Sequence, residues 1–487
     1  MNYWLVRSKW GVENKKAEFI NNDEWINGYD DKYLDIVKRV QVEDILLLAE
    51  ESTVTHYGKC IENPQDGKQL IVDKWGILKK PIIFPAKGAY IKAITKLNDD
   101  NLIDVVQLEI EATIVSNDIK IKSISIENFT VFKNELLDFS DGLDIVVGEN
   151  GTGKSHLLKL LYSLIVSINH ITESYAEYYE KKMVINEALS ESIELNLIQI
   201  FKPDELSNLR NYDENYCLIR VIFDKYSVAI NLDSSYSHNS IFGSAFSGIS
   251  FVPDHIKIIE EENLPSEFFE KSSIFIPAKE MLSFYEGFVP LYETRESSFD
   301  EIYYNLAKSL GLSALKNIES YPVESKLLSK LEEILEGKIL LERGRFYLVA
   351  TKNGHKTEIA LIAEGLRKIA TIAQLIANGS LNKNSILFWD EPEANLNPRL
   401  IKKMAELLVE LSRAGMQVFI ATHSLFLVKE IEILRNKQDK VKYFGLGLNE
   451  DKEVRVSQSE DFEYLEDIVI LDEELAQDDR FLSKEEG

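Results

Sequence analysis

Gly148-Glu149-Asn150-Gly151-Thr152-Gly153-Lys154-Ser155 is a complete G-x-x-x-x-G-K-[ST] phosphate-binding loop. The apolar run 143–147 precedes it and helical spacing follows over residues 156–168, so we expect the loop to join a buried strand to a helix. Its glycines let backbone N–H groups face phosphate at the positive end of that helix. We therefore predict a nucleotide site, with Lys154 bridging the β- and γ-phosphates and Ser155 helping to hold Mg²⁺. The predicted contact residues are Gly148, Asn150, Gly151, Thr152, Gly153, Lys154 and Ser155.

A second apolar run, residues 385–389, ends in the acids Asp390 and Glu391. A carboxylate at the end of a buried strand can reach a metal bound to phosphate, so we expect Asp390 to be a Mg²⁺ ligand. Glu391 is one residue further on and is predicted to polarise the attacking water as a general base. An acidic strand end that simply faces solvent is the alternative. Glu393 follows Pro392 and is expected to be solvated or to support the loop.

A third apolar run, residues 417–421, is followed by Thr422-His423-Ser424. A histidine at this point could hydrogen-bond the γ-phosphate and report its presence, whereas on its own it could be an ordinary helix-start residue. The three segments together predict an enzyme that binds ATP and Mg²⁺ and hydrolyses ATP. Glu391 and His423 are its predicted catalytic residues.

Composition places the chain among proteins without a membrane span or a disulfide framework. No run of about 18 apolar residues is present, and the first residues lack the apolar region of a secretory signal. Cys60 and Cys217 are the only cysteines in 487 residues, which excludes a zinc cluster as well. The expected location is the cytoplasm. A formal net charge of −26 opposes broad binding to nucleic-acid phosphates.

Charge and aromatic content change along the chain. Residues 1–96 hold 15 Lys/Arg against 14 Asp/Glu, whereas the remainder holds 40 against 67. Four of the five tryptophans also lie in this first part, at Trp4, Trp10, Trp25 and Trp75. We therefore predict a separate N-terminal domain. The predicted domains are 1–115, then 118–450 with a mixed insertion at 170–345, and an acidic tail at 451–487.

The expected fold class is α/β, without a sustained heptad run and so without a long coiled-coil arm. Alternation and turn signals predict a small α/β or β-barrel-like fold for the N-terminal domain. Strands are expected at 3–7, 44–49, 54–62, 69–72, 122–129, 216–223, 227–232 and 274–279.

The segment from about Lys122 to Asn436 resembles the ABC-type ATPases, and within them the OLD-like ATPases of bacterial defence systems. The residues that carry this resemblance are 126–129, 148–155, 390–398 and 422–424. The phosphate-binding loop is shared by many nucleotide hydrolases, whereas Asp-Glu-Pro-Glu with a later Thr-His-Ser is more specific. The resemblance implies an ABC-type head that forms a homodimer or higher homo-oligomer by sandwiching ATP between two heads.

The resemblance also implies a signature segment that one head donates to the nucleotide of the other. The candidate is Ala363-Glu364-Gly365-Leu366-Arg367-Lys368, in which Glu364, Gly365 and Arg367 are the predicted contacts. The family commonly has serine where Ala363 stands, so Arg367 or Lys368 is expected to replace a missing hydroxyl contact. An ordinary amphipathic helix start is the alternative. Asn395 and Asn397 are expected on a loop at the dimer seam.

The family resemblance implies the sensor or regulatory component of an anti-phage defence system. No second carboxylate cluster follows His423, so we expect the effector, a nuclease or another toxin, to be a separate chain. One alternative is an SMC-like ATPase of DNA repair or chromosome maintenance. The ATPase subunit of a membrane transporter and a slowly hydrolysing scaffold are further alternatives.

The N-terminal segment resembles EVE or PUA-like domains more distantly, through residues 3–6, Trp25 and 44–49 followed by Tyr57-Gly58-Lys59. That resemblance implies an aromatic-lined pocket that binds nucleic acid. A structural or protein-docking domain, with the tryptophans in its core, is the other interpretation. A solvated end is expected for the acidic tail, and a short docking helix around 464–471 is the alternative.

Overall fold

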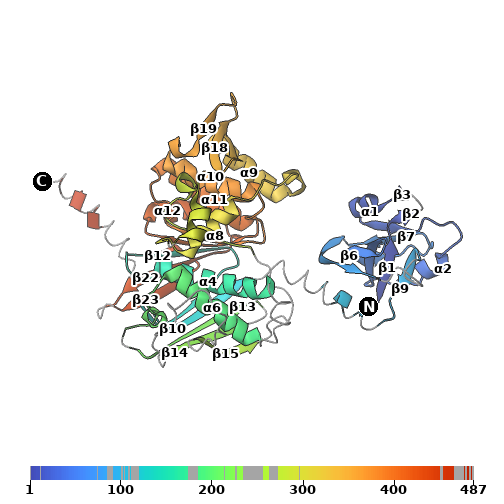
Figure 1. Ribbon diagram of the computed structural model, residues 1–487, viewed down its shortest axis with the longest axis horizontal. Helices are drawn as coiled ribbons and strands as arrows, with labels where there is room; N and C mark the ends of the chain where they lie inside the picture. Colours follow the sequence, from blue (N-terminus) through green and yellow to red (C-terminus); the bar gives the residue numbers. More distant parts are fainter. Residues whose placement is uncertain are drawn as a thin grey trace. The chain divides into compact units, whose positions relative to one another are not determined.

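The computed structural model describes residues 2–10, 13–73, 75–84, 92–99, 102–103, 105–107, 110, 120–173, 185–212, 214–224, 227–233, 256–262, 272–295, 297–449, 453–465, 476–477, 480–481 and 484. The chain divides into two compact units, residues 1–118 and 119–487 (Figure 1).

The first unit is built on a seven-stranded sheet in the order β4-β7-β6-β5-β1-β9, with β8 also paired to β6. β1 and β5 are parallel, and the other pairs are antiparallel. The expected strands of this unit are therefore present. Their bounds are β1 Tyr3–Arg7, β4 Glu24–Ile26, β5 Ile45–Glu50, β6 Thr53–Glu62, β7 Gln69–Val72, β8 Gly76–Ile83 and β9 Ile94–Lys96, with the short pair β2 Lys9–Trp10 and β3 Glu13–Asn14 and the helices α1 Lys16–Asn22 and α2 Leu34–Val37 beside them.

Alternate residues of β1 and β5 point into two apolar clusters on opposite faces of the sheet. Trp4, Trp25 and Trp75 all belong to one of these clusters and are at most 5% exposed. Each indole N–H has a partner: Asp44 for Trp4, the Arg7 carbonyl for Trp25 and the Glu24 carbonyl for Trp75. These three tryptophans are core residues, as the structural interpretation expected, although Trp4 also borders a cavity beside β9.

The second unit contains a six-stranded sheet in the order β16-β20-β21-β12-β22-β23. All neighbours are parallel except β22 and β23. Every residue of β12 and β21 is buried, as expected for central strands covered on both faces. The bounds are β12 Leu143–Gly148, β16 Ser273–Ile276, β20 Ile386–Asp390, β21 Gln417–Thr422, β22 Val441–Leu448 and β23 Val454–Ser459.

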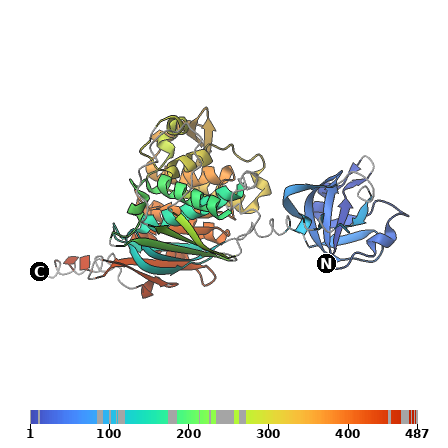
Figure 2. The ribbon, with the colours of Figure 1, turned by 60° about the horizontal axis from the view of Figure 1, so that its bottom comes forward.

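Helices cover this parallel sheet. α4 (Lys154–Glu173) packs on β12, β16, β20 and β21, and α11 (Pro398–Arg413) packs on β12 and β21. α6 lies against α4, and a group of helices with the hairpin β17–β18 completes the unit (Figures 1 and 2). Their bounds are α6 Ile185–Phe201, α7 Phe288–Thr294, α8 Glu301–Leu310, α9 Pro322–Leu335, α10 Glu364–Ala377, α12 Leu425–Leu434, β17 Gly337–Glu342, β18 Arg345–Ala350 and β19 Lys356–Glu358.

An antiparallel sheet, ordered β11-β10-β13-β14-β15, forms the other layer of the unit. The span 170–345, expected as an insertion, supplies three of its five strands and also supplies β16 of the parallel sheet. Only part of that span is therefore an addition to the nucleotide-binding core. Pairing between β10 and β13 joins residues about a hundred positions apart, which local sequence patterns do not reveal. The bounds are β10 Ile121–Phe129, β11 Phe132–Asp138, β13 Tyr216–Phe223, β14 Ser227–Asp233 and β15 Ile256–Glu262.

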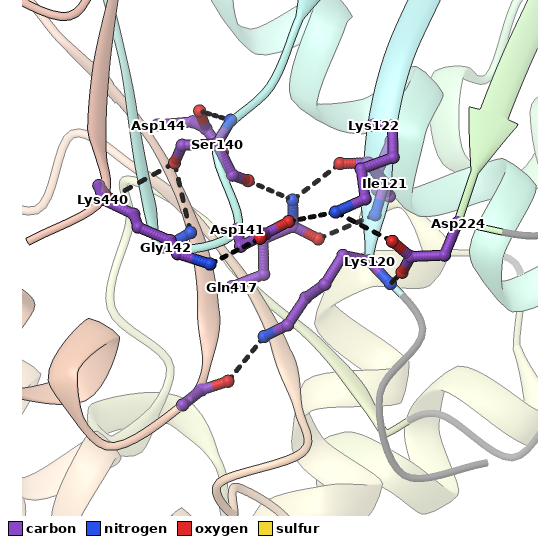
Figure 3. A network of polar contacts seen from close by, with 11 residues as sticks. Lys120, Ile121, Lys122, Ser140, Asp141, Gly142, Asp144, Asp224, Gln417 and Lys440 are labelled. Atoms are coloured by element: carbon purple, nitrogen blue, oxygen red, sulfur yellow. Dashed lines mark hydrogen bonds and ion pairs between the residues drawn. The ribbon is translucent and has the colours of Figure 1, made fainter. Parts of the chain in front are cut away.

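The buried side chain of Gln417, at the start of β21, joins the two sheets (Figure 3). Its Oε1 accepts from the Ile121 N–H at 2.9 Å, and its Nε2 donates to the Ile121 and Ser140 carbonyls at 2.8 Å each. Lys122 forms ion pairs with Asp141 and Asp224 beside this junction. The side-chain amide of Gln417 thus satisfies three backbone polar groups at the junction of the two sheets.

The C-terminal boundary differs from the expected one. β23 pairs with β22 along its whole length, so residues 454–459 belong to the sheet and not to a tail. Of residues 464–471, where a docking helix was the alternative, 466–471 lie outside the described part of the chain, and Tyr464 ends a short 3-10 helix, Phe462–Tyr464. Among the described helices, none is long and apolar enough to cross a membrane.

Candidate nucleotide-binding and catalytic site

The carboxyl ends of β12, β20 and β21 lie side by side at one edge of the parallel sheet. Val147 of β12 is in register with Thr422 of β21, and Asp390 of β20 is in register with Ala421. The phosphate-binding loop, the acids and the histidine therefore leave the sheet at the same edge. This edge is where ligands bind in open α/β sheets.

The phosphate-binding loop, residues 148–155, joins β12 to α4 as its sequence predicts. Gly151 and Gly153 have φ values of +86° and +93°, in the left-handed region that favours glycine. A Cβ atom on Gly153 would also lie 2.6 Å from Val131 Cγ2. The Thr152 hydroxyl donates to the Glu149 carbonyl at 2.9 Å and holds the turn. Asn150 is exposed at its tip.

Lys154, the first residue of α4, is 6% exposed. Its ammonium donates to the carbonyls of Gly148 at 2.8 Å and Glu149 at 2.7 Å. Burial lowers the pKa of Lys154, and the charges of the acids at 390, 391 and 393 oppose that shift. The acids at the end of β20 thus act electrostatically on the lysine of the loop. A triphosphate offers this ammonium stronger acceptors than two carbonyls do.

Asp390, at the end of β20, and Ser155, in the first turn of α4, are hydrogen-bonded to each other. Burial raises the pKa of Asp390, while a hydrogen bond from the Ser155 hydroxyl acts in the opposite direction. The Oδ1 atom of Asp390 is buried and accepts no hydrogen bond from the described residues. Mg²⁺ in nucleotide sites commonly takes one or two protein oxygens and completes its shell with phosphate and water. The two side chains fit that ion and would be its protein ligands.

Glu391 has an unusual backbone conformation, with φ of +47°. Its N–H donates to the Ala421 carbonyl at 2.8 Å, so β21 fixes it from one side. Its Oε1 lies 3.4 Å from His423 Nδ1. A left-handed conformation at a residue other than glycine costs on the order of 1–2 kcal/mol and persists only where its surroundings impose it. The predicted general base is therefore held in place by its neighbours.

Glu393 is 5% exposed, so of its two expected roles, a solvated side chain or a support for the loop, the second is the one that fits. Its Oε1 accepts from the Thr422 hydroxyl at 2.6 Å and from the His423 N–H at 3.3 Å. The same atom lies 3.8 Å from His423 Nδ1. Pro392 gives the local sequence no clear strand or helix pattern, which is why only the fold reveals this burial.

The predicted signature segment begins α10, as expected, with Ala363 at the N-cap and without a side-chain cap. Two of its cations, however, are engaged inside the chain. Arg367 Nε lies 2.7 Å from the nearly buried carboxylate of Glu280. The Lys368 ammonium donates to the Glu391 carbonyl at 2.9 Å. Both side chains are therefore bound within the chain, and the expected contact of Arg367 or Lys368 with a partner's nucleotide stays a prediction.

Glu364 and Gly365 contact the segment that follows Glu391. Asn395 Nδ2 donates to Glu364 Oε1 at 2.8 Å. A Cβ on Gly365 would lie 2.6 Å from Leu396 Cδ2, so glycine permits this close packing. Asn397 caps α11 by accepting from the Leu400 N–H.

Sequence reasoning missed Glu280 and Lys279, which follow β16. Ile276 is in register with Trp389, so the residues after β16 leave the sheet at the same edge as Asp390. Glu280 holds Arg367, and Lys279 lies on the exposed surface beside the Phe284 and Phe299 rings. Only the strand pattern ending at a proline pointed to this segment, and it did not show which sheet the strand joins.

Comparison with known proteins matches residues 145–429, more than half of the chain, to the family described as "AAA domain, putative AbiEii toxin, Type IV TA system". An ATP/GTP phosphatase of Helicobacter pylori is 34% identical over 99 residues, or 20% of this chain and 26% of that protein. The Old nuclease of Escherichia phage P2 is 38% identical over 71 residues, or 15% and 12%.

Among solved structures, the SMC head domain from Thermotoga maritima covers 70% of this chain and 99% of its own. At 12% identity and a TM-score of 0.37, that likeness carries no further argument. The chain spans half or less of the length of the curated relatives that it matches. The family match covers the phosphate-binding loop, Asp390, Glu391 and His423, so this chain belongs to the AAA-domain family of P-loop ATPases named above.

Proposed function

We propose that this protein hydrolyses ATP in the presence of Mg²⁺. Lys154 binds the β- and γ-phosphates, Asp390 and Ser155 hold the ion, Glu391 polarises the attacking water and His423 contacts the γ-phosphate. The observation that carries this proposal is the approach of Asp390, Glu391 and His423 to the phosphate-binding loop at one sheet edge. Because Glu391 Oε1 and His423 Nδ1 lie 3.4 Å apart, the two side chains can respond together to the γ-phosphate.

The test is ATP turnover by the purified chain, measured as phosphate release with and without Mg²⁺. The proposal expects Mg²⁺-dependent release that is lost in Glu391→Gln. Absence of measurable release from the unmodified chain, under conditions where it binds ATP, refutes the proposed turnover and favours a scaffold that hydrolyses ATP very slowly.

The proposed assembly is a homodimer or higher homo-oligomer in which the start of α10 approaches the nucleotide of the partner head. The closely packed Gly365 and the helix N-terminus beside it support this, since such ends favour anions. Light scattering of Glu391→Gln with and without ATP tests it. An ATP-dependent doubling of mass is expected, and an unchanged monomer refutes it.

The proposed biological role is control of a separate effector, such as a nuclease or another toxin, in defence against phage. The family description, which names a toxin, and the match to the phage Old nuclease support this role. The experiment is a pull-down of Glu391→Gln with ATP, co-expressed with the products of its neighbouring genes. A co-purifying toxic enzyme supports the role. Recovery of the chain alone, with salt-dependent DNA binding, favours the SMC-like alternative.

A second function, binding of nucleic acid by the first unit, is supported by a cavity of about 540 Å³ beside β9. Its described lining includes Trp4, Arg39, Lys92 and Lys96, and none of the described lining residues carries a carboxylate. These three cations form no ion pair within the described residues, whereas Lys9, Lys59 and Lys68 of the same unit are each paired with an acid. Unpaired cations around a cavity suit the phosphates of a single strand.

The matched variants are Arg39→Ser/Lys92→Ser/Lys96→Ser and, as a control with the same charge change, Lys9→Ser/Lys59→Ser/Lys68→Ser. Binding of a fluorescent single-stranded oligonucleotide to the full chain is measured by anisotropy at 50 mM salt. The first triple variant is expected to weaken binding about tenfold or more, and the control to leave it within about twofold. Equal effects of the two variants contradict a specific site.

A further inference from the structure

Helix α10 contacts the loop after β20 at three points on one of its faces. We call residues 391–397 the catalytic loop. The Lys368 ammonium donates a hydrogen bond to the Glu391 carbonyl. The Glu364 carboxylate accepts one from the Asn395 side chain, and Gly365 packs against Leu396. Position 368 is four residues after 364 and three residues after 365, and both spacings place side chains on the same side of a helix. The helix start and the loop are therefore joined by two hydrogen bonds and one close packing contact.

Lys368 makes the contact nearest to the reacting groups. Lys368 is only 1% exposed, although a lysine is almost never fully buried unless its charge has a partner. The stem crosses the core, and the ammonium ends at the Glu391 carbonyl, 2.9 Å away. The carboxylates of Glu393, Glu364, Glu391 and Asp390 are close enough to act on its charge. The ammonium thus lies among the acids around the catalytic loop, which supply charges of opposite sign.

The backbone of Glu391 is held at both of its polar groups. Its N–H bonds the Ala421 carbonyl of β21, and its C=O bonds Lys368. Between these two contacts the residue keeps a φ of +47°. Loss of either contact leaves the costly left-handed conformation without support, so the backbone can relax and turn the side chain away.

We infer that Lys368 is a positioning residue that holds Glu391 in the orientation required for its role as base and couples that orientation to the start of α10. This inference rests on the proposed hydrolysis by Glu391. It adds a direction of control: an anion that displaces the N-terminus of α10 displaces Glu391 of the same chain. Lys368 acts through the backbone of Glu391 and need not touch the nucleotide.

The activity test compares Lys368→Met, which keeps the apolar stem but removes the donor, with Lys368→Arg, which restores a charged donor. Thr371→Val is the matched control, because Thr371 is buried one turn further along α10 and its hydroxyl bonds the Arg367 carbonyl of its own helix. Lys368→Met is expected to lower kcat about 10- to 100-fold, with ATP affinity within about threefold of the unmodified chain. Lys368→Arg should recover a substantial part of that loss.

A second readout needs no turnover. Amide hydrogen exchange of peptides covering 390–397, without nucleotide, is expected to accelerate about tenfold or more in Lys368→Met and to stay unchanged in Thr371→Val. Unchanged exchange, or a kcat within threefold of the unmodified chain, overturns the inference. If Lys368→Met does not fold, Lys368→Gln serves, with the same two criteria. Absence of turnover in the unmodified chain refutes the proposed hydrolysis instead, and exchange still decides the role of Lys368.

Discussion

The Thr422 hydroxyl donates a 2.6 Å hydrogen bond to Glu393 Oε1 and so ties the end of β21 to the loop after β20. Both side chains are buried, at 0% and 5% exposure. The same carboxylate oxygen accepts a hydrogen bond from the His423 N–H, so Glu393 also fixes the backbone position of His423. Two of the three segments of the site are thus joined by one carboxylate that sequence reasoning did not assign to the site.

Removal of that carboxylate should destabilise the second unit. Glu393→Ala leaves the buried Thr422 hydroxyl and the His423 N–H without their acceptor, which typically costs about 1–3 kcal/mol. Glu393→Gln keeps an acceptor oxygen and should cost less than half as much. Urea unfolding followed by tryptophan fluorescence measures both values. Equal costs for the two variants would show that the carboxylate charge, and not its acceptor role, matters.

Lys154→Ala should abolish ATP binding, because no other residue of the phosphate-binding loop has a positively charged side chain. The affinity is expected to fall about 100-fold or more, in line with charge-assisted contacts to phosphate. Lys437→Ala is the control, since it removes an exposed cation that lines a separate cavity beside Lys440. Calorimetric titration with ATP measures both, and tight binding by Lys154→Ala refutes the role of this lysine.

Glu391→Gln should separate binding from turnover. The amide keeps nearly the same shape but cannot accept the proton of water, so turnover should fall about 10²- to 10⁴-fold while ATP stays bound. The control is Glu463→Gln, an exposed acid far along the chain. Phosphate release and nucleotide retained after gel filtration are the measurements. Turnover that is unchanged in Glu391→Gln assigns the base to another residue.

Stability should depend on pH through Asp144, which is fully buried in β12. Burial raises its pKa well above the ordinary value, against opposing hydrogen bonds from Ser140 and the charge of Lys442, while Asp141 adds to the rise. A raised carboxyl pKa in the folded state means that stability is full at low pH and is lost as pH rises through that pKa. The unfolded chain releases this proton more readily.

Asp144→Asn removes the titrating group and retains an oxygen that can accept from the Ser140 N–H. The variant should therefore exceed the unmodified chain in stability by a margin that widens from pH 5 to pH 8. Urea midpoints across this range, at constant ionic strength, provide the measurement. Parallel pH profiles for the two proteins would contradict the assignment to Asp144.

Some expectations could be read from local sequence and were confirmed. The strands at 3–7, 69–72 and 216–223 have the expected bounds, and the phosphate-binding loop joins a buried strand to a helix. Alternation and apolar runs act between residues close in sequence, so they are visible without a fold.

The position of each acid relative to the others was only partly predictable. Asp390 and Glu391 end a buried strand, and parallel strands bring their carboxyl ends to one edge, so their approach to Lys154 follows from the sequence once the sheet is assumed. Arg367 shows the limit of that reasoning. Its partner Glu280 follows a strand whose place next to β20 no local pattern indicates.

By itself, the sequence determined the phosphate-binding loop, the strand ends that carry Asp390 and His423, and the compositional change that sets the first unit apart. These features depend on backbone geometry and polarity over a few adjacent residues. Only the tertiary structure decided that Glu393 is buried, that β16 lies in the parallel sheet and that Lys368 reaches Glu391. Those facts depend on how distant segments pack, because a buried charge selects its partner from whatever the fold brings within hydrogen-bond distance.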